Sequence, residues 1–232
     1  MEEGVVRRRV LPHIDVDGKA YFITGCLDGS ISALGLSKIL AYRNHLAELK
    51  KPADLSILQW EDRRKRLLFK FVDDLLDDHS AVRHLDDPRC SSIVEEAFLH
   101  FANVRYLLLA YVVMPSHHHW LFLPDEDWSL THLNEPHSLK KQRTAREAIS
   151  HSIQSYTANQ CNRVLGRTGR FWQVETYDHY VRDEAELLRI VNYIENNPVK
   201  AGLVTNPVDW QWSSARLRRD LGIEPGSPLS KR

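Results

Sequence analysis

Two short apolar runs that flank three consecutive histidines constrain the fold more than any other stretch of this sequence. The first run, residues 106–113, is rich in Leu, Val and Tyr, which is typical of a buried β-strand. Residues 114–116, Met-Pro-Ser, interrupt it, and a second run leads from the histidines to Leu123. We therefore predict two buried strands that pair as a hairpin.

The histidines themselves occupy alternating sides of the second predicted strand. Side chains two positions apart share a face, with Cα atoms roughly 6.5 Å apart, so His117 and His119 should face one way and His118 the other. Neutral imidazole is a common ligand of divalent metals. Core histidines with satisfied nitrogens, or a solvated strand end, explain this pattern equally well. Two histidines are also too few to hold a metal, so a third ligand must come from elsewhere.

A second candidate group lies on a helix predicted to begin after Asp183 and to end at Pro198. Asp183 is a suitable N-cap, and Glu186 has the spacing of a capping box, whereas proline disfavours helix in the residue before it. Tyr193 and Asn197 lie one turn apart on the flank of the apolar stripe. From this helix alone, a boundary tyrosine and a C-capping asparagine are the simpler explanation.

Composition limits the class of protein. With 43% hydrophobic residues, the chain can build a sizeable core. It has no apolar stretch of the ~18–20 residues that span a membrane, and its acidic start lacks the apolar segment of a signal peptide. Its three scattered cysteines fit a reducing cytosol. We expect a cytoplasmic protein with one domain over residues 1–220 and a flexible tail over 221–232.

Charge is balanced overall but unevenly spread. The formal net charge is zero, which taken alone counts against a nucleic-acid-binding protein. Residues 73–87 are acidic, whereas residues 137–170 are strongly basic and are compatible with a groove for phosphates. Within such a groove, Phe171 and Trp172 could stack unpaired bases, although at least one of them is more simply core. A solvated helix face is the commoner explanation of any single basic run, including residues 63–66.

The remaining elements follow from apolar periodicity and from turn residues. Residues 86–88, Asp-Asp-Pro, should stop a helix, and residues 124–127 should form an exposed turn. We expect Ser91 or Ser92 to cap the helix that follows the stop. The predicted strands are 20–26 and 177–181, and the predicted helices are 37–49, 58–78, 91–101 and 139–164.

Two distant motifs occur together in this sequence. Met-Pro-Ser-His-His-His at 114–119, followed by Tyr-Ile-Glu-Asn-Asn-Pro-Val at 193–199, resembles the single-tyrosine HUH transposases, and most of all the REP-associated tyrosine transposases. The similarity covers most of residues 7–212. His118 departs from the family, in which a hydrophobic residue is usual, and Ser116 stands where Asn is common. Shorter matches are residues 11–14, 21–24, 105–113, 155–158, 169–173 and 178–183.

The resemblance implies a fold and a site. The fold is α+β, with a ferredoxin-like (RRM-like) antiparallel sheet, helices packed on it and helical insertions. The metal ligands fall on His117, His119 and Asn197, and the nucleophile falls on Tyr193. The implied cofactor is Mg²⁺ or Mn²⁺. The implied partner is single-stranded DNA with a hairpin (REP-like) structure. The protein is expected to act as a monomer or a homodimer. The candidate DNA contacts are Lys140, Arg163, Arg167, Arg170, Trp172 and Lys200.

The implied reaction is attack of Tyr193 on a phosphodiester, which gives a 5′-phosphotyrosine and a free 3′-OH. A metal held by two imidazoles and one amide keeps its charge for the anionic substrate. Something must take the phenol proton, because an unperturbed tyrosine has a pKa near 10; Lys200 and Glu195 are the candidates within reach. Two alternatives stay open: a relative that binds structured single-stranded nucleic acid without cutting it, and a metal-dependent phosphodiester hydrolase in which Tyr193 is dispensable.

Overall fold

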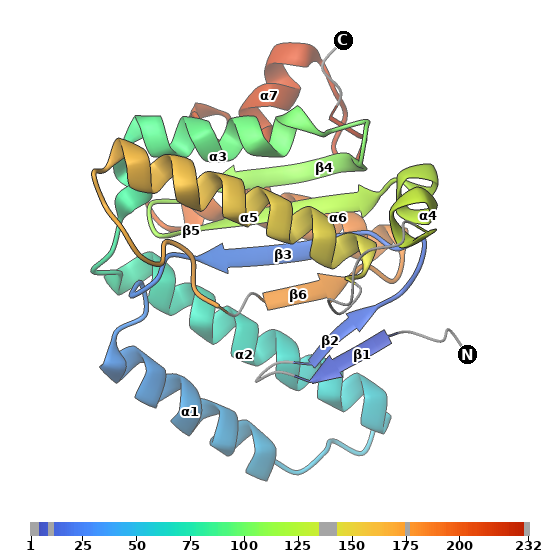
Figure 1. Cartoon of the computed structure of the whole chain (residues 1–232). Coiled ribbons are helices and arrows are strands. Elements are labelled where there is room, and N and C mark those ends of the chain that lie inside the picture. Colours follow the sequence, from blue (N-terminus) through green and yellow to red (C-terminus); the bar gives the residue numbers. More distant parts are fainter. Residues whose placement is uncertain (1–4, 9–11, 135–142, 175–176, 230–232) are drawn as a thin grey trace.

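The centre of the molecule is a four-stranded antiparallel sheet with the strand order β4-β5-β3-β6. A computed structural model describes all of the chain except residues 1–4, 9–11, 135–142, 175–176 and 230–232 (Figure 1). The predicted hairpin is confirmed, because the two apolar runs pair as β4 and β5. The strands are β3 (Tyr21–Cys26), β4 (Tyr106–Val113), β5 (His117–Pro124) and β6 (Tyr177–Tyr180).

The topology is ferredoxin-like, as the resemblance implied. Along the chain, β3 is followed by helix α3 (Pro88–His100), the β4–β5 hairpin, helix α5 (Ala145–Val164) and β6. Strand β5 lies between β3 and β4 and runs antiparallel to both. Both crossing helices cover the same face of the sheet (Figure 1).

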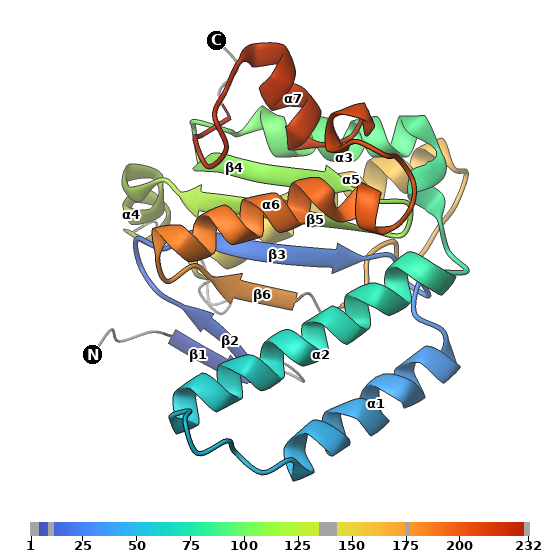
Figure 2. The same ribbon diagram turned by 180° about the vertical axis from the view of Figure 1, so that it is seen from behind.

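The opposite face carries the inserted and C-terminal helices. Helices α2 (Ile57–His79) and α6 (Glu184–Lys200) lie across it, and α1 (Ala33–Glu48) packs on α2 (Figure 2). This face is where segments from distant parts of the sequence meet. The remaining elements are β1 (Val5–Arg8), β2 (Pro12–Asp15), α4 (Glu126–Asn134), α7 (Ser214–Leu221) and the 3₁₀ turns His84–Asp86 and Pro207–Asp209.

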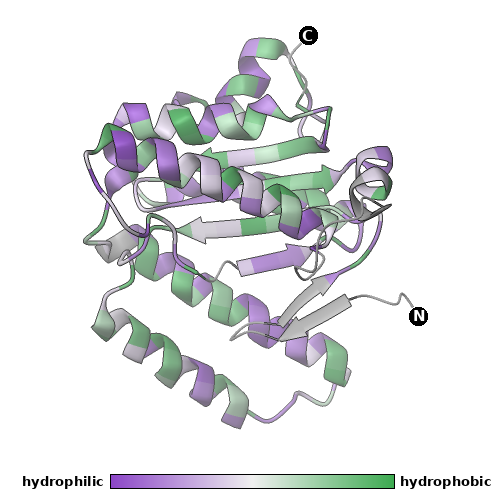
Figure 3. Ribbon diagram, viewed as in Figure 1, coloured by the Kyte–Doolittle hydropathy of each residue, from purple (hydrophilic) through white to green (hydrophobic). Residues whose placement is uncertain are grey.

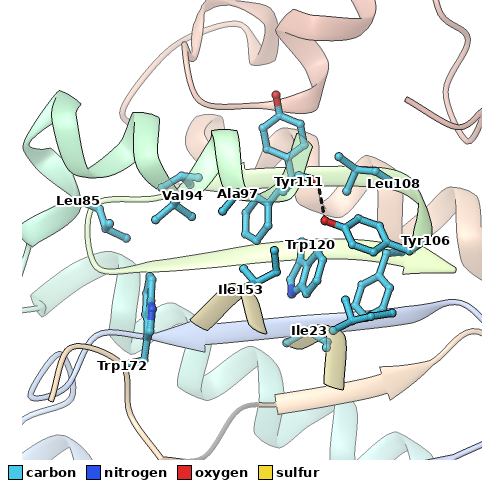
Figure 4. Packing of buried hydrophobic residues seen from close by; sticks show 14 of the residues in the cluster. Ile23, Leu85, Val94, Ala97, Tyr106, Leu108, Tyr111, Trp120, Ile153 and Trp172 are labelled. Atoms are coloured by element: carbon cyan, nitrogen blue, oxygen red, sulfur yellow. Dashed lines mark hydrogen bonds between the residues drawn. The ribbon is translucent and has the colours of Figure 1, made fainter. Parts of the chain in front are cut away.

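Because both faces of the sheet are covered, its inner strands β3 and β5 are almost continuously buried. Figure 3 shows hydrophobic residues concentrated in the middle strands and hydrophilic ones in β6 at the edge. Under α3 and α5 the core is aromatic: Trp120 stacks on Phe98 and Phe122, with ring centroids 4.9 and 4.1 Å apart (Figure 4). Burying such rings contributes more than their area alone. The core therefore fixes β5, the strand that carries the histidines.

Several helix boundaries differ from the sequence prediction because a capping residue acts before the apolar pattern begins. Asp87 caps α3 by accepting a hydrogen bond from the Arg89 amide, so residues 86–88 start a helix instead of stopping one. Ser32 caps α1, which begins at Ala33, four residues before the predicted start. Residues 124–127 are not merely an exposed turn, since Asp125 accepts from the Trp128 amide at the start of α4.

The C-terminal boundaries differ as well. Pro198 lies inside the last turn of α6, which runs on to Lys200. Helix α5 begins at Ala145 after a Thr144 capping box, and the predicted part before residue 143 lies outside the described residues. Part of the segment 221–229, which we expected to be a flexible tail, contacts the rest of the fold. Ile223 packs against the core, and the buried Leu229 donates its amide to the Leu108 carbonyl at 2.7 Å, whereas most of the other residues are exposed. None of the described helices is both long and apolar enough to cross a membrane.

Candidate active site

The alternation along β5 places the histidines as predicted. His117 and His119 face the side of the sheet covered by α2 and α6, and His118 faces the aromatic core, where its ring lies 5.2 Å from Phe98 and 4.9 Å from Trp172. All three imidazoles are buried, with 2% or less of their surface exposed. The strand therefore delivers two imidazoles to one site.

A hydroxyl group orients each of the paired histidines. Thr24 Oγ1 lies 2.7 Å from His119 Nδ1, and Ser116 Oγ lies 3.0 Å from His117 Nδ1. Hydrogen bonding of one ring nitrogen leaves the other available, which is the arrangement that prepares a histidine for metal binding. The two Nε2 atoms both face Asp73, at 3.9 Å from His117 and 3.1 Å from His119.

Asp73 is the residue that the sequence analysis missed. It comes from α2, is 1% exposed, and completes a group of three ligand atoms that all lie within 4.8 Å of one another. A signal was present in the sequence. Asp73 lies four residues after Phe69 and three before Leu76, so it interrupts the apolar stripe of an amphipathic helix. A carboxylate on that stripe has to be buried when the stripe packs.

Four polar atoms of the site are buried and lack a hydrogen-bond partner among the described residues. They are Asp73 Oδ1, Asp77 Oδ1, His117 Nε2 and Asn197 Oδ1. An unsatisfied buried polar atom costs about 1–3 kcal/mol, so such atoms rarely gather without a function. A divalent cation accepts imidazole nitrogen together with carboxylate and amide oxygen. The residues present therefore fit a metal ion.

Tyr193 and Asn197 of α6 reach this group. The Tyr193 phenol donates a hydrogen bond to Asp73 Oδ2, and its ring lies 5.6 Å from the His119 ring. Asn197 Nδ2 lies 3.2 Å from His119 Nε2. The structure thus brings the predicted nucleophile and all three predicted metal ligands into contact around Asp73, whereas their roles stay predictions.

Electrostatics explain the state of each group. Burial lowers the pKa of His117 to about 3, so the ring is neutral and able to bind a cation. Burial and then the Asp73 charge raise the pKa of Asp77 to about 6. The same two causes raise the pKa of Tyr193, which keeps the phenol protonated. Burial opposes ionisation of Asp73, but its contacts with His119, His117 and Lys200 outweigh burial and lower its pKa.

Lys200 is engaged by carboxylates and is not a free DNA contact. Its Nζ lies 2.8 Å from Asp73, 2.8 Å from Asp74 and 3.2 Å from Asp77. The site thus holds more acid than the sequence predicted, and protein carboxylates offset part of the charge of a bound metal. Glu195 is excluded as an acceptor for the phenol proton, because it is buried against α7 and pairs with Arg218 at 2.7 Å.

The remaining predicted DNA contacts lie away from this cluster. Trp172 is buried in the aromatic core (Figure 4) and donates its Nε1 hydrogen to Thr157, so it is not available to stack a base. Arg163 belongs to α5, on the opposite face of the sheet. Arg167 and Arg170 lie in the exposed loop that leads from α5 to the end of β3. Lys140 lies outside the described residues.

Comparison with known proteins gives one sequence relative. No family model matches the chain. A protein of Haemophilus influenzae described as a "Putative REP-associated tyrosine transposase" is 38% identical over 63 residues, 27% of this chain. The match spans 35% of that relative's length, which is too little to assign the relative's activity to this chain.

A solved structure described as the REP-associated tyrosine transposase bound to a REP hairpin aligns with 94% of this chain and 93% of its own, at 17% identity and a TM-score of 0.45. That likeness is too distant to bear on function. The resemblance that the motifs indicated is confirmed by the sequence match: over the matched stretch this chain is similar to a REP-associated tyrosine transposase.

Proposed function

We propose that this protein is a metal-dependent single-stranded DNA transposase that cuts and rejoins strands through a covalent bond to Tyr193. The observation that carries the proposal is the contact of Tyr193 of α6 with Asp73 of α2, beside the two histidines of β5. A tyrosine, a carboxylate and two imidazoles from three separate elements meet in one buried cluster.

The chemistry follows from the position of the phenol. Its oxygen forms a bond to the scissile phosphorus and the bond from phosphorus to the 3′ oxygen breaks. The 3′ oxygen takes up a proton from solvent and leaves as a hydroxyl, which balances the proton lost by the phenol. The phenol already donates its hydrogen to Asp73, so Asp73 both places the nucleophile and offers an acceptor for the proton. Because the phosphotyrosine keeps the phosphodiester energy, the reverse step rejoins strands.

His117, His119 and Asp73 would hold Mg²⁺ or Mn²⁺, with the Asn197 amide oxygen as a further donor. A cation held there would neutralise the charge of the substrate phosphate and stabilise the leaving oxygen. Thr24 and Ser116 contribute by fixing the two imidazole rings, so the ligands need little rearrangement when the ion binds.

Lys200 borders the entrance to this site. Its side chain is 35% exposed, whereas Asp73 and both imidazoles are almost fully buried. A phosphate that approaches Tyr193 therefore meets the ammonium group first, and we include Lys200 as a phosphate contact that leaves Asp74 and Asp77 when DNA binds. The proposed substrate is single-stranded hairpin DNA of the REP type: the sequence relative's name supports the association with REP elements, and the hairpin is what the resemblance of the motifs implies.

The test uses end-labelled single-stranded hairpin DNA from the flanks of the gene, incubated with the protein and Mn²⁺ and resolved on a denaturing gel. Tyr193→Phe is the decisive variant. Tyr177→Phe is the matched control, because Tyr177 packs on the same Phe69 ring at 4.3 Å. A covalent protein–DNA band should form with wild type and Tyr177→Phe and disappear with Tyr193→Phe.

Two other outcomes would replace the proposal. Cleavage that survives in Tyr193→Phe, without any covalent band, would establish a phosphodiester hydrolase that uses activated water. Binding without cleavage by the wild-type protein, on every flanking sequence and with both metals, would establish a non-cleaving binder of structured DNA.

A further inference from the structure

A basic site separate from the Tyr193 cluster lies towards the N-terminal end of α2. Helices α2 and α6 lie on the same side of the sheet (Figure 2). A cavity of about 440 Å³ opens at that end of α2, beside Arg182, which directly precedes α6 and its N-cap Asp183. Arg63 and Arg66 of α2 and Arg182 before α6 line it, together with Leu55, Gln59 and Asp62. The proposed reaction uses none of these side chains.

Ion pairs hold two of the three guanidinium groups in place. Arg182 Nη1 lies 3.1 Å from Asp62, and Arg66 Nη2 lies 3.2 Å from the same carboxylate oxygen. Arg182 also pairs with the buried Glu186 at 2.5 Å. Arg63 is exposed and has no hydrogen bond or ion pair in the part of the chain that the structure describes. The cavity wall therefore carries three cations and one carboxylate, Asp62.

This arrangement accounts for the basic run on α2, which the sequence alone left as a solvated face. Arg63 and Arg66 are three residues apart and share the face that lines the cavity. Arg64 points elsewhere, with its guanidinium 5.9 Å from the Trp60 ring. The cavity lining thus divides the run into two residues that face the cavity and two, Arg64 and Lys65, that do not.

The same helix connects the cavity to the proposed reaction centre. At 1.5 Å per residue, Arg66 precedes Asp73 by about 10 Å along the axis of α2, and Arg63 by about 15 Å. Phe69 and Tyr177 lie between them, with ring centroids 4.3 Å apart. A DNA strand with one phosphate at Tyr193 can therefore follow α2 to the cavity within a few nucleotides.

We propose that this cavity binds a phosphodiester group of the single strand, a few nucleotides from the bond that Tyr193 cuts, and thereby fixes the register of the strand. Planar guanidinium groups match the geometry of phosphate oxygens and bind them with two parallel hydrogen bonds. The inference rests on the proposed function for the identity of the strand, whereas the affinity for phosphate rests on the three arginines.

The test compares two double variants that remove equal charge from the same turns of α2. Arg63→Ala/Arg66→Ala removes two of the three arginines of the cavity wall, and Arg64→Ala/Lys65→Ala is the matched control. Affinity for a labelled single-stranded oligonucleotide from the gene flank is measured by fluorescence anisotropy in EDTA over a range of NaCl. The cavity variant should lower the slope of log affinity against log salt by about 0.7 per lost phosphate contact, and the control should leave it nearly unchanged. Thermal melting checks that both fold.

A second measurement locates the phosphate. Each linkage of the oligonucleotide is replaced in turn by an uncharged methylphosphonate. Neutralising a single linkage, at some distance from the cut, should weaken binding to wild type and the control, and should have a clearly smaller effect on the cavity variant, which keeps only Arg182. Equal losses for both double variants, or no linkage whose effect depends on the cavity arginines, would overturn the proposal.

The same proteins are assayed for the covalent band at Tyr193. If one linkage depends on the cavity arginines but no covalent band forms, the proposed reaction is refuted and the phosphate site is supported. If the covalent band forms but no linkage depends on the cavity arginines, the reaction is supported and the phosphate site is refuted.

Discussion

The pairing of Gly25 with His118 allows a quantitative test of the core behind the histidine pair. Gly25 lies opposite His118 in the β3–β5 ladder. A methyl group at Gly25 would come within 2.4 Å of His118 Nε2 and 2.8 Å of its Cε1. The imidazole cannot easily retreat, because it packs against Phe98 and Trp172. Overpacking of this kind costs about 1–3 kcal/mol, and the entropy gained by replacing a strand glycine offsets about 0.5–1 kcal/mol. We expect Gly25→Ala to lower the free energy of unfolding by about 1–2 kcal/mol.

The cause is isolated by a double-mutant cycle with His118→Val, measured by urea denaturation in EDTA near neutral pH. Valine is smaller than histidine and removes Nδ1, a buried atom with no hydrogen-bond partner among the described residues. In the His118→Val background, Gly25→Ala should be neutral or stabilising, which gives a coupling of at least about 1 kcal/mol. An equal penalty in both backgrounds would refute the steric argument.

Three further predictions concern the metal site and acid stability. Thr24→Val removes the hydroxyl that orients His119 and should weaken Mn²⁺ binding about 10–100-fold by calorimetry; unchanged affinity would show that Thr24 has no such role. Wild type at 100-fold excess of Mn²⁺ over its dissociation constant should gain about 2.7 kcal/mol of stability, EDTA should reverse the gain, and Asp73→Asn should lose most of it; an equal gain in the variant would place the ion elsewhere. Burial opposes ionisation of Glu186, but the hydrogen bonds from Arg182 outweigh it and lower the pKa of Glu186 to about 2. Because this folded-state value is below the unfolded one, the group stabilises the fold above about pH 4.5 and loses up to about 3 kcal/mol as the pH falls towards 2. Glu186→Gln should flatten that part of the stability profile measured by urea unfolding, and an unchanged profile would contradict the assignment.

Much of the site followed from short-range patterns. The 106–123 hairpin, the opposite facing of His117 and His118, and the proximity of Tyr193 and Asn197 on one helix are all confirmed. Each depends only on the spacing of side chains along a single element. Backbone geometry fixes that spacing wherever the element forms.

The tertiary structure decided which elements meet. In the sequence, Asp73 was only one of several acids in an acidic region. In the structure, α2 packs across the sheet and buries Asp73 beside the imidazoles. Lys200 and Trp172 were both assigned to DNA by residue type. Packing pairs Lys200 with the Asp73 cluster, where its role as a phosphate contact stays a prediction, and it buries Trp172 in the core. A charged or aromatic side chain has the same local signal in either setting. Its role depends on the partner that packing brings to it, and that partner lies far away in the sequence.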